Sequence, residues 1–181
     1  MYLEIHKNVE LLIAKQKTEM LQIRPATLDD INAITQIYNE AINNTTATFD
    51  TEKKSVDDRI KWFLDHDEKH PVIVAEKENQ VVGWASLSKW SDRSAYDTTV
   101  EESVYVHKDF RGQGIGKSLL EIITLEGGSL GLHTILARIT EGNASSIHIH
   151  ELMGYEHIGV MRQVGKKFGR FLDVHLMQKI F

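Results

Sequence analysis

The sequence predicts a single mixed α/β domain, with the element order β-α-α-β-β-β-α-β-α-β-β. Three observations lead to this prediction. Two apolar patterns follow one another along the chain: short continuous runs, which are typical of strands, and residues spaced three to four apart, which are typical of helices. A glycine-rich loop joins a strand to a helix beyond the middle of the chain. The 181 residues are enough for one domain with a sizeable core, and no repeat or linker divides them.

The first twenty residues are expected to be an extension of a domain that covers residues 21–181. Ile5, Val9, Leu12 and Ile13 have roughly helical spacing. The extension is therefore either an amphipathic helix that packs on the domain or on a partner subunit, or a frayed arm. The sequence does not decide between the two.

One strand and two helices come first in the domain. Leu21–Arg24 is a short strand, and the Asp29-Asp30 pair offers an N-cap to a helix that ends at Asn43. Ser55 begins the second helix with Ser-Val-Asp-Asp, which resembles a capping box with Asp in place of Glu. This helix is expected to end near Asp65, because a proline follows and the residue before a proline disfavours helical geometry.

Three strands follow. Pro71–Glu76 is an apolar strand, and the Glu78-Asn79 turn leads back into Gln80–Ser88, so that the two strands form a hairpin. Thr98–Val106 is the next strand and ends in the apolar sequence Ser-Val-Tyr-Val.

Two helices and a buried strand follow the glycine-rich loop. Gly112–Leu130 begins as this loop and continues as a helix. Thr134–Ile139 is a mostly apolar run, typical of a buried strand. Asn143–Met153 is a helix with Asn143 as its expected N-cap, and Gly154 stops it. The apolar face of the first of these helices is predicted to consist of Ile115, Leu119, Ile122 and Ile123.

Two strands close the domain. Tyr155–Val164 and Phe171–Gln178 are predicted as strands, and the turn that joins them contains Gly165 and Gly169. The strands and helices together predict a layered α/β arrangement.

Composition excludes several classes of protein and site. The formal net charge of −5 gives no general attraction to nucleic acid or to an anionic membrane. No apolar run reaches membrane-spanning length and no export signal is visible, so we expect a cytoplasmic protein. The absence of cysteine excludes disulfides, thiolate zinc sites and a cysteine nucleophile. If the protein transfers an acyl group, no thiol of its own carries it.

The glycine-rich loop begins at Arg111 with the sequence RGQGIGKS. A Walker A loop would need a glycine at this arginine, and a dinucleotide fingerprint would need one at Lys117. The pattern R-x-x-G-x-G fits completely. Its three glycines let the backbone approach an anion, and the loop opens a helix whose first amides are unpaired. We interpret the loop as a diphosphate-binding nest, and the alternative is a turn that only joins strand to helix.

The run EESVYVHKDFRGQGIGKSLL, which contains this loop, resembles the central motif of the GCN5-related N-acetyltransferases, the GNAT superfamily. The resemblance extends from Ile23 to Phe181. Three further runs look like the phosphinothricin and methionine sulfoximine acetyltransferase branch: AYDTTVEESVYV, IHIHELMGYEHIG and LDVHLMQKIF. The resemblance implies a mostly antiparallel central sheet flanked by helices, and it makes a homodimer the expected assembly.

The resemblance also implies acetyl-CoA as the acetyl donor. The backbone of Val104, Tyr105 and Val106 would hold the pantetheine arm as a neighbouring strand does. If this strand splays from its neighbour, an N–H around Tyr105–Val106 would bind the oxyanion. Asn143 would contact the pantetheine or thioester region, or it is only a helix N-cap, and the two roles are compatible. The residues expected around the pyrophosphate are Arg111, Gly112, Gln113, Gly114, Ile115, Gly116 and Lys117.

Acetyl transfer to an amine requires a proton acceptor, because an ammonium has no lone pair. Glu101 and Glu102 are adjacent in a strand and therefore point to opposite faces. Glu101 matches the catalytic acidic residue of the family; without that match, both would be solvated carboxylates. His150 stands where many relatives have a tyrosine general acid, so it would protonate the CoA thiolate or orient Glu101, or it only fills a polar spot. We predict no metal, since His148 and His150 lie on different helix faces.

Four loop residues border the expected acceptor side: Phe49, Trp90, Arg93 and Tyr96. In the branch that the chain resembles, equivalents of Phe49, Arg93 and Tyr96 line the pocket. Arg93 would bind a substrate carboxylate bidentately while the aromatic rings shape a small slot. The alternative is that the aromatic residues only pack and that Arg93 is solvated.

The leading hypothesis is a small-molecule N-acetyltransferase. It would transfer an acetyl group by direct attack of the primary amine of an amino-acid-like acceptor such as phosphinothricin or methionine sulfoximine. Acetylation of protein N-termini or lysines is an alternative, although the aromatic and arginine residues of the loops favour a closed pocket. A non-catalytic acyl-CoA-binding sensor is a further alternative. The sequence leaves the physiological acceptor open.

Overall fold

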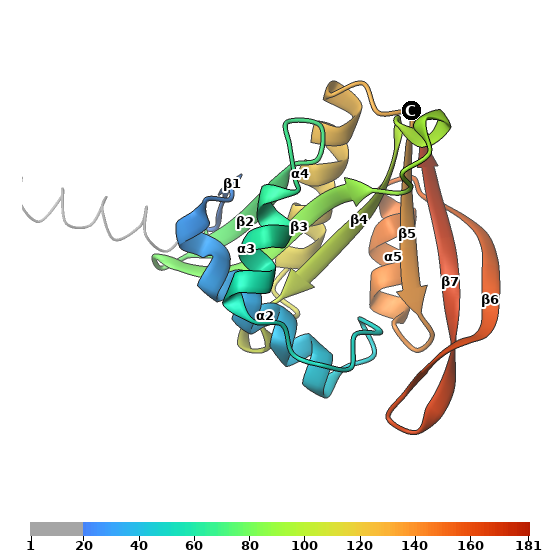
Figure 1. The fold of residues 1–181 in the computed structure, drawn as a ribbon, viewed down its shortest axis with the longest axis horizontal. Helices are drawn as coiled ribbons and strands as arrows, with labels where there is room; N and C mark the ends of the chain where they lie inside the picture. Colours follow the sequence, from blue (N-terminus) through green and yellow to red (C-terminus); the bar gives the residue numbers. More distant parts are fainter. Residues whose placement is uncertain (1–19) are drawn as a thin grey trace, which may run out of the picture.

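One seven-stranded sheet forms the centre of the molecule in a computed structural model that describes residues 20–181 (Figure 1). The strand order is β1-β2-β3-β4-β5-β7-β6, and β4 and β5 are its parallel pair while the other neighbours run antiparallel. The predicted mixed, mostly antiparallel sheet is confirmed. The strands are β1 (Gln22–Pro25), β2 (Val72–Lys77), β3 (Gln80–Lys89), β4 (Thr99–Val106), β5 (Thr134–Thr140), β6 (Glu156–Lys167) and β7 (Arg170–Ile180).

Helices cover both faces of the sheet. α2 (Ile31–Asn44) and α3 (Val56–Leu64) lie in front of it in Figure 1, and α4 (Ile115–Ser129) and α5 (Ala144–Leu152) lie behind it. Among residues 20–181 we find no helix with the length and apolar character that a membrane span requires. The predicted N-terminal extension falls, except for its last residue, outside the described residues, and the domain boundary stays a prediction.

The predicted element order is confirmed, with boundaries shifted by a few residues. Side-chain caps begin two of the helices, α3 and α5, whereas Asp30 makes no side-chain cap bond at the start of α2. Ser55 Oγ accepts the Asp58 N–H at 3.1 Å and the Asp58 carboxylate accepts the Ser55 N–H at 3.3 Å, so the capping box is present. Asn143 Oδ1 accepts the Ser146 N–H at 3.2 Å, which confirms the predicted N-cap of α5.

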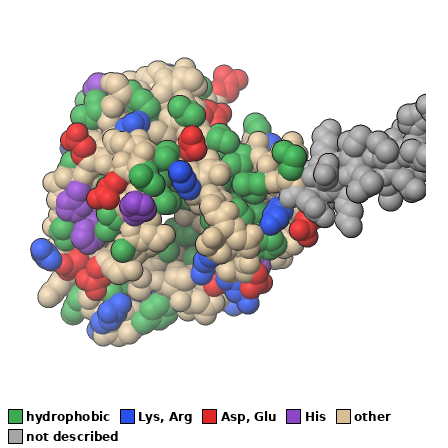
Figure 2. All heavy atoms as spheres, turned by 180° about the vertical axis from the view of Figure 1, so that it is seen from behind, with side chains coloured by type: hydrophobic (Ala, Val, Ile, Leu, Met, Phe, Trp, Pro, Cys, Tyr) green, Lys and Arg blue, Asp and Glu red, His purple; other side chains and the backbone are tan. Residues whose placement is uncertain are grey.

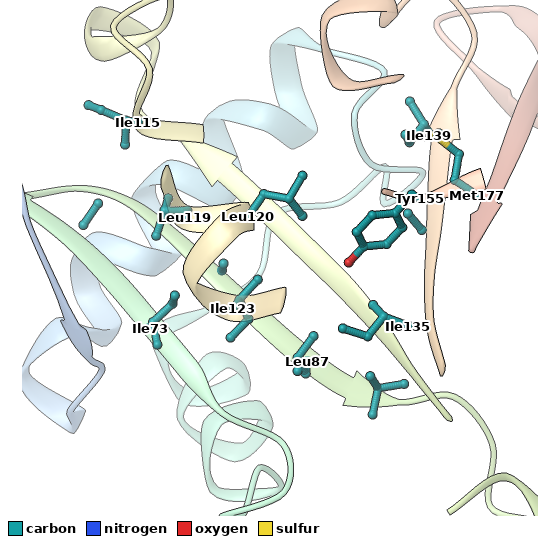
Figure 3. Packing of buried hydrophobic residues seen from close by; sticks show 14 of the residues in the cluster. Ile73, Leu87, Ile115, Leu119, Leu120, Ile123, Ile135, Ile139, Tyr155 and Met177 are labelled. Atoms are coloured by element: carbon teal, nitrogen blue, oxygen red, sulfur yellow. The ribbon is translucent and has the colours of Figure 1, made fainter. Parts of the chain in front are cut away.

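The core lies on both sides of the sheet. Figure 3 shows the larger cluster, in which side chains of α4 meet residues of the sheet and Tyr155. The predicted apolar face of α4 is wrong at Ile122, which is 39% exposed, whereas Leu120 is fully buried. The buried stripe extends toward Leu120 because α4 packs there on Tyr155, whose hydroxyl lies 3.1 Å from Thr124 Oγ1. The smaller cluster, under α2, contains Ile31, Ile34, Ile37, Val72, Val74 and Trp84.

The β6–β7 hairpin corrects one turn prediction. Lys167 pairs with Arg170, so the turn consists of Phe168 and Gly169 alone, with φ angles of 50° and 80°. Positive φ at both central residues is what a type I′ hairpin turn requires. Gly165 lies inside β6 instead of in the turn.

Close packing explains why residue 165 is a glycine. A Cβ placed there would overlap the ring of Phe49, which comes from the loop after α2. The same loop accepts a hydrogen bond from the buried Lys167, whose Nζ donates to the carbonyl of Thr48 at 2.7 Å. The glycine therefore marks a close approach between two distant segments.

Candidate active site

The parallel strands β4 and β5 pair over only part of their length. The last pair joins Glu101 to Leu136, although β4 continues to Val106 and β5 to Thr140. Figure 1 shows the two strands diverging beyond this point. Among residues 20–181, no strand pairs with β4 along this gap beyond Glu101.

Alternation along β4 decides which main-chain groups face this gap. The N–H of His107 donates to the carbonyl of Val82 on β3 at 2.8 Å. In an antiparallel pair every second residue turns its N–H and C=O to the neighbour, so those of Val104 and Val106 turn the other way, into the gap. The amide of Tyr105 points to β3 by the same rule. Val106 is thus the better placed member of the predicted Tyr105–Val106 oxyanion pair.

A groove of about 450 Å³ brings the end of β4 together with the loops that follow α2 and β5. Five residues predicted around acetyl-CoA line it: Val104, Tyr105, Val106, Arg111 and Asn143. The opposite wall includes Thr45, Thr46, Ala47, Glu141, Gly142 and Arg170. Seen from behind, the surface is hollowed near its middle, with basic and histidine side chains beside the hollow (Figure 2).

Ion pairs hold the side chains at the rim of this groove. Arg111 pairs with Glu40 of α2, and its Nε donates to the carbonyl of Val106 at 3.1 Å. Arg170 Nη1 lies 4.0 Å from Glu141 Oε1. Arg111 is thus anchored beside the predicted donor site, with its side chain 43% exposed.

The glycine-rich loop has the geometry of an anion nest. Gly112 and Gly114 have φ angles of 75° and 82°, and a Cβ at either would meet no atom within 4 Å. Gly114 caps α4 without a side-chain hydrogen bond, so the first amides of the helix need another partner. Lys117 is exposed at this end of α4. These features fit a diphosphate.

The glycine-rich loop offers a ligand mainly backbone groups, because several of its side chains are buried or already bonded. Ile115 is only 3% exposed and its side chain belongs to the core, so this side chain does not bind a ligand. Gln113 is occupied by Lys77, whose Nζ donates to Gln113 Oε1 at 3.1 Å. Gly116 packs against Val106 of β4: a Cβ added at this glycine would lie 3.6 Å from Val106 Cγ2.

Glu101 faces the front of the sheet, where the β4–β5 gap begins. Arg138 of β5 binds its carboxylate bidentately: Nη2 donates to Oε2 at 2.6 Å and Nε pairs with Oε1. The guanidinium carbon of Arg138 lies 5.7 Å from the centre of the Trp90 ring. A carboxylate, a guanidinium and an indole therefore lie together at this point.

Residues 32–155 match the family model described as Acetyltransferase (GNAT) family. The chain belongs to the GNAT family. It is an acetyltransferase by this membership, and the β4–β5 gap and the glycine-rich loop lie at the positions that the GNAT resemblance of the sequence predicts.

Named GNAT acetyltransferases resemble the chain over most of its length. The L-methionine sulfoximine/L-methionine sulfone acetyltransferase of Pseudomonas aeruginosa is 40% identical over 158 residues, which cover 86% of this chain and 92% of that protein. The phosphinothricin N-acetyltransferase of Streptomyces coelicolor is 35% identical, over 87% of this chain and 94% of that protein. The crystal structure of a phosphinothricin acetyltransferase from Sinorhizobium meliloti in complex with acetyl-CoA is 33% identical and superposes with a TM-score of 0.85, covering 89% of this chain and 88% of that one.

In this GNAT domain Glu102 points behind the sheet, as strand alternation predicts, and meets His150 of α5. Glu102 Oε1 lies 2.8 Å from His150 Nε2, and the imidazole is 2% exposed. His150 Nδ1 donates to the carbonyl of Ser146 at 2.7 Å, because a carbonyl can only accept. The short contact at Nε2 then requires a proton between the imidazole and the carboxylate.

This pair corrects one prediction about His150. Its partner is Glu102 and not Glu101, because the two glutamates occupy opposite faces of β4. Both ring nitrogens are bonded within the protein, so His150 reaches no ligand directly without rearranging. The catalytic role predicted for it stays a prediction.

The same pair predicts a pH dependence of stability. Burial disfavours the imidazolium, but the Glu102 carboxylate and the Ser146 carbonyl together outweigh it and raise the pKa of His150 above its ordinary value of 6.5. The folded state then binds more protons than the unfolded chain above pH 6.5. The stabilisation that protonated His150 adds to the free energy of unfolding is fully present below pH 6.5. It is lost as the pH rises through the pKa that His150 has in the folded protein.

Urea unfolding at a series of pH values checks this expectation. The wild type should lose stability in that window, and Glu102→Gln should lose this part of the dependence because the buried imidazole is then neutral. His148→Asn is the matched control, since His148 lies on the same helix and is exposed. A wild-type pH profile in Glu102→Gln would contradict the proton-sharing pair.

The four predicted acceptor-side residues come from two loops: Phe49 follows α2, and Trp90, Arg93 and Tyr96 lie between β3 and β4. Phe49 packs on Gly165, and Trp90 lies beside Arg138. The side chains of Arg93 and Tyr96 make no hydrogen bond or ion pair with Glu101 among residues 20–181. Their predicted roles at the acceptor stay predictions.

Arg138 was not among the predicted site residues, although its position in the sequence is unusual. It is a lone arginine in the run Thr134–Ile139, which is otherwise apolar or small. The alternation of β5 buries Ile135, Ala137 and Ile139 against the helices behind the sheet and turns Arg138 to the front. A charged residue at such a position needs a partner, and the partner of Arg138, Glu101, lies 37 residues away in the chain.

Proposed function

We propose that this GNAT protein transfers the acetyl group of acetyl-CoA to the primary amine of a small amino-acid-like acceptor. The observation that carries the proposal is the position of Glu101, whose carboxylate stands where the β4–β5 gap opens. The glycine-rich loop would hold the diphosphate of the donor. The edge of β4 at Val104 and Val106 would hold its pantetheine arm. The activities named for the relatives support the class of acceptor.

The reaction needs one proton acceptor and one nucleophile. Glu101, directly or through water, takes a proton from the acceptor ammonium and frees its lone pair. The nitrogen attacks the thioester carbon, and the main-chain N–H of Val106 donates to the carbonyl oxygen as it gains charge. The C–S bond then breaks, the nitrogen loses its second proton, and the CoA thiolate takes up one proton. The products are the acetamide, CoA thiol and one proton.

An assay of CoA thiol release with a panel of acceptors tests the proposal. The panel should include methionine sulfoximine, phosphinothricin, common amino acids and short peptides. We expect turnover with one or more small amino acids or analogues. Turnover of peptides alone would favour the protein acetyltransferase alternative. Binding of acetyl-CoA without turnover of any amine would favour the sensor and overturn the proposal.

We further propose a cytoplasmic homodimer. Large apolar side chains that are half exposed or more gather on the β6–β7 hairpin: Ile158, Val164, Phe168, Phe171 and Ile180. Such a surface suits a second copy of the chain better than water. Light scattering of the full chain should give the mass of two copies, and a monomer would contradict this.

A further inference from the structure

The Glu101–Arg138 pair occupies the place that the proposed mechanism assigns to the acceptor. The side chain of Arg138 is 51% exposed and that of Glu101 is 20% exposed. Arg138 lies two residues beyond Leu136, the last residue of β5 that pairs with β4. The guanidinium therefore stands at the mouth of the gap, on the same face as the proposed base.

This ion pair can be opened at little cost. A salt bridge at the protein surface contributes little to stability, since water solvates its separated charges well. The guanidinium presents several donors in a planar fork that matches a carboxylate. Both members can thus exchange partners when a ligand offers the same charges.

An α-amino acid offers these charges in the right combination. Its ammonium is the counter-ion that Glu101 needs, and its carboxylate is the one that Arg138 needs. The two groups are attached to one carbon, so they reach two side chains that already touch. One internal ion pair is then replaced by two that connect the ligand to the protein.

We infer that Arg138 binds the α-carboxylate of the acceptor while Glu101 receives its amine. This inference rests on the proposed acetyltransferase function. It assigns to Arg138 the carboxylate-binding role that the sequence suggested for Arg93. The reason is that Arg138 already binds Glu101, whereas the hydrogen bonds found for Arg93 among residues 20–181 involve its backbone: its N–H donates to Ser91 Oγ at 3.3 Å and its carbonyl accepts from the Tyr96 N–H at 2.9 Å.

The specificity follows from charge. An amine that lacks the carboxylate must compete with Arg138 for Glu101 and leaves the guanidinium without its partner. A peptide N-terminus lacks the α-carboxylate as well, because that group forms the next amide bond. Both are expected to be poorer acceptors than the free amino acid.

The test compares an α-amino acid with the amine that differs from it only by replacement of the carboxylate by hydrogen. The acceptor is the best amino acid of the panel, and kcat/KM is measured for both compounds at saturating acetyl-CoA. We expect Arg138→Gln to lower kcat/KM for the amino acid roughly 10- to 100-fold, the usual effect of losing hydrogen bonds to a charged group. For the decarboxylated amine the value should stay unchanged or rise, because Glu101 is then free. Arg138→Lys should retain part of the preference as a single charge without the fork.

Two further variants make the result decisive. Arg162→Gln removes an exposed arginine that pairs with Asp173 on the β6–β7 hairpin, and it should leave both values unchanged. Arg93→Gln tests the competing anchor. A selective loss in Arg93→Gln and not in Arg138→Gln would overturn the inference, and so would an equal loss with both compounds in Arg138→Gln. If the wild type acetylates both compounds equally well, the inference fails while the proposed function stands, whereas no turnover of any amine is a failure of the function itself.

Discussion

Replacement of Glu101 by Gln is expected to lower kcat/KM for acetyl transfer roughly 100- to 10,000-fold, the usual range for loss of a general base. The amide keeps the size of the side chain and still accepts a hydrogen bond from Arg138, but it cannot take a proton from an ammonium. The rate is measured as thiol release from acetyl-CoA. Calorimetry should show unchanged CoA binding, because Glu101 lies outside the groove that the donor is proposed to occupy.

The pH profile of this variant separates a lost base from a distorted site. Without a base, only acceptor molecules that are already unprotonated react, and their fraction rises about tenfold per pH unit below the pKa of the amine. The rate of Glu101→Gln should therefore rise steeply with pH where that of the wild type has levelled off. Glu121→Gln, an exposed carboxylate on α4, should behave as the wild type. A wild-type rate in Glu101→Gln at neutral pH would place the base elsewhere.

Replacement of Gly114 by Val is expected to weaken acetyl-CoA binding by about tenfold or more, equivalent to at least about 1.4 kcal/mol of binding free energy. Gly114 has a φ angle of 82°, which a β-branched residue adopts only with strain. The new side chain would project into open space in front of the first amides of α4, where the diphosphate is proposed to lie. Titration calorimetry with CoA measures the loss directly.

Gly131 provides the matched control for this substitution. It follows the other end of the same helix, has a φ angle of 78°, and has equally open space beside it. Gly131→Val should therefore cause a similar loss of folding stability, measured by urea unfolding, without changing CoA affinity. Equal losses of affinity in the two variants would show that helix strain, and not the anion nest, explains the result.

These two substitutions probe different halves of the reaction. Glu101→Gln should spare the donor and affect the chemistry, whereas Gly114→Val should affect the donor and lower the rate chiefly at subsaturating acetyl-CoA. A double variant should then show roughly the product of the two effects on kcat/KM, because the two sites share no contact among those described.

Local features of the sequence predicted what depends on near neighbours along the chain. Ser55 and Asn143 cap their helices because the groups that they bond lie three residues away. The adjacent glutamates 101 and 102 face opposite sides because side chains alternate in any strand. The turn prediction at Gly165 failed for the opposite reason, since a ring from a distant loop, and not the local backbone, requires the missing side chain.

The sequence by itself determined the element order, the nest of amides at Gly112–Lys117 and the family, because each depends on short-range geometry or on a contiguous motif. Only the tertiary structure decided the partners of the charged groups. Glu101 meets Arg138 across 37 residues, and Glu102 meets His150 across 48. Such pairs depend on which strands become neighbours and on where β4 and β5 separate, and the packing of the whole chain determines both. The acceptor site that we propose is therefore a property of the folded sheet.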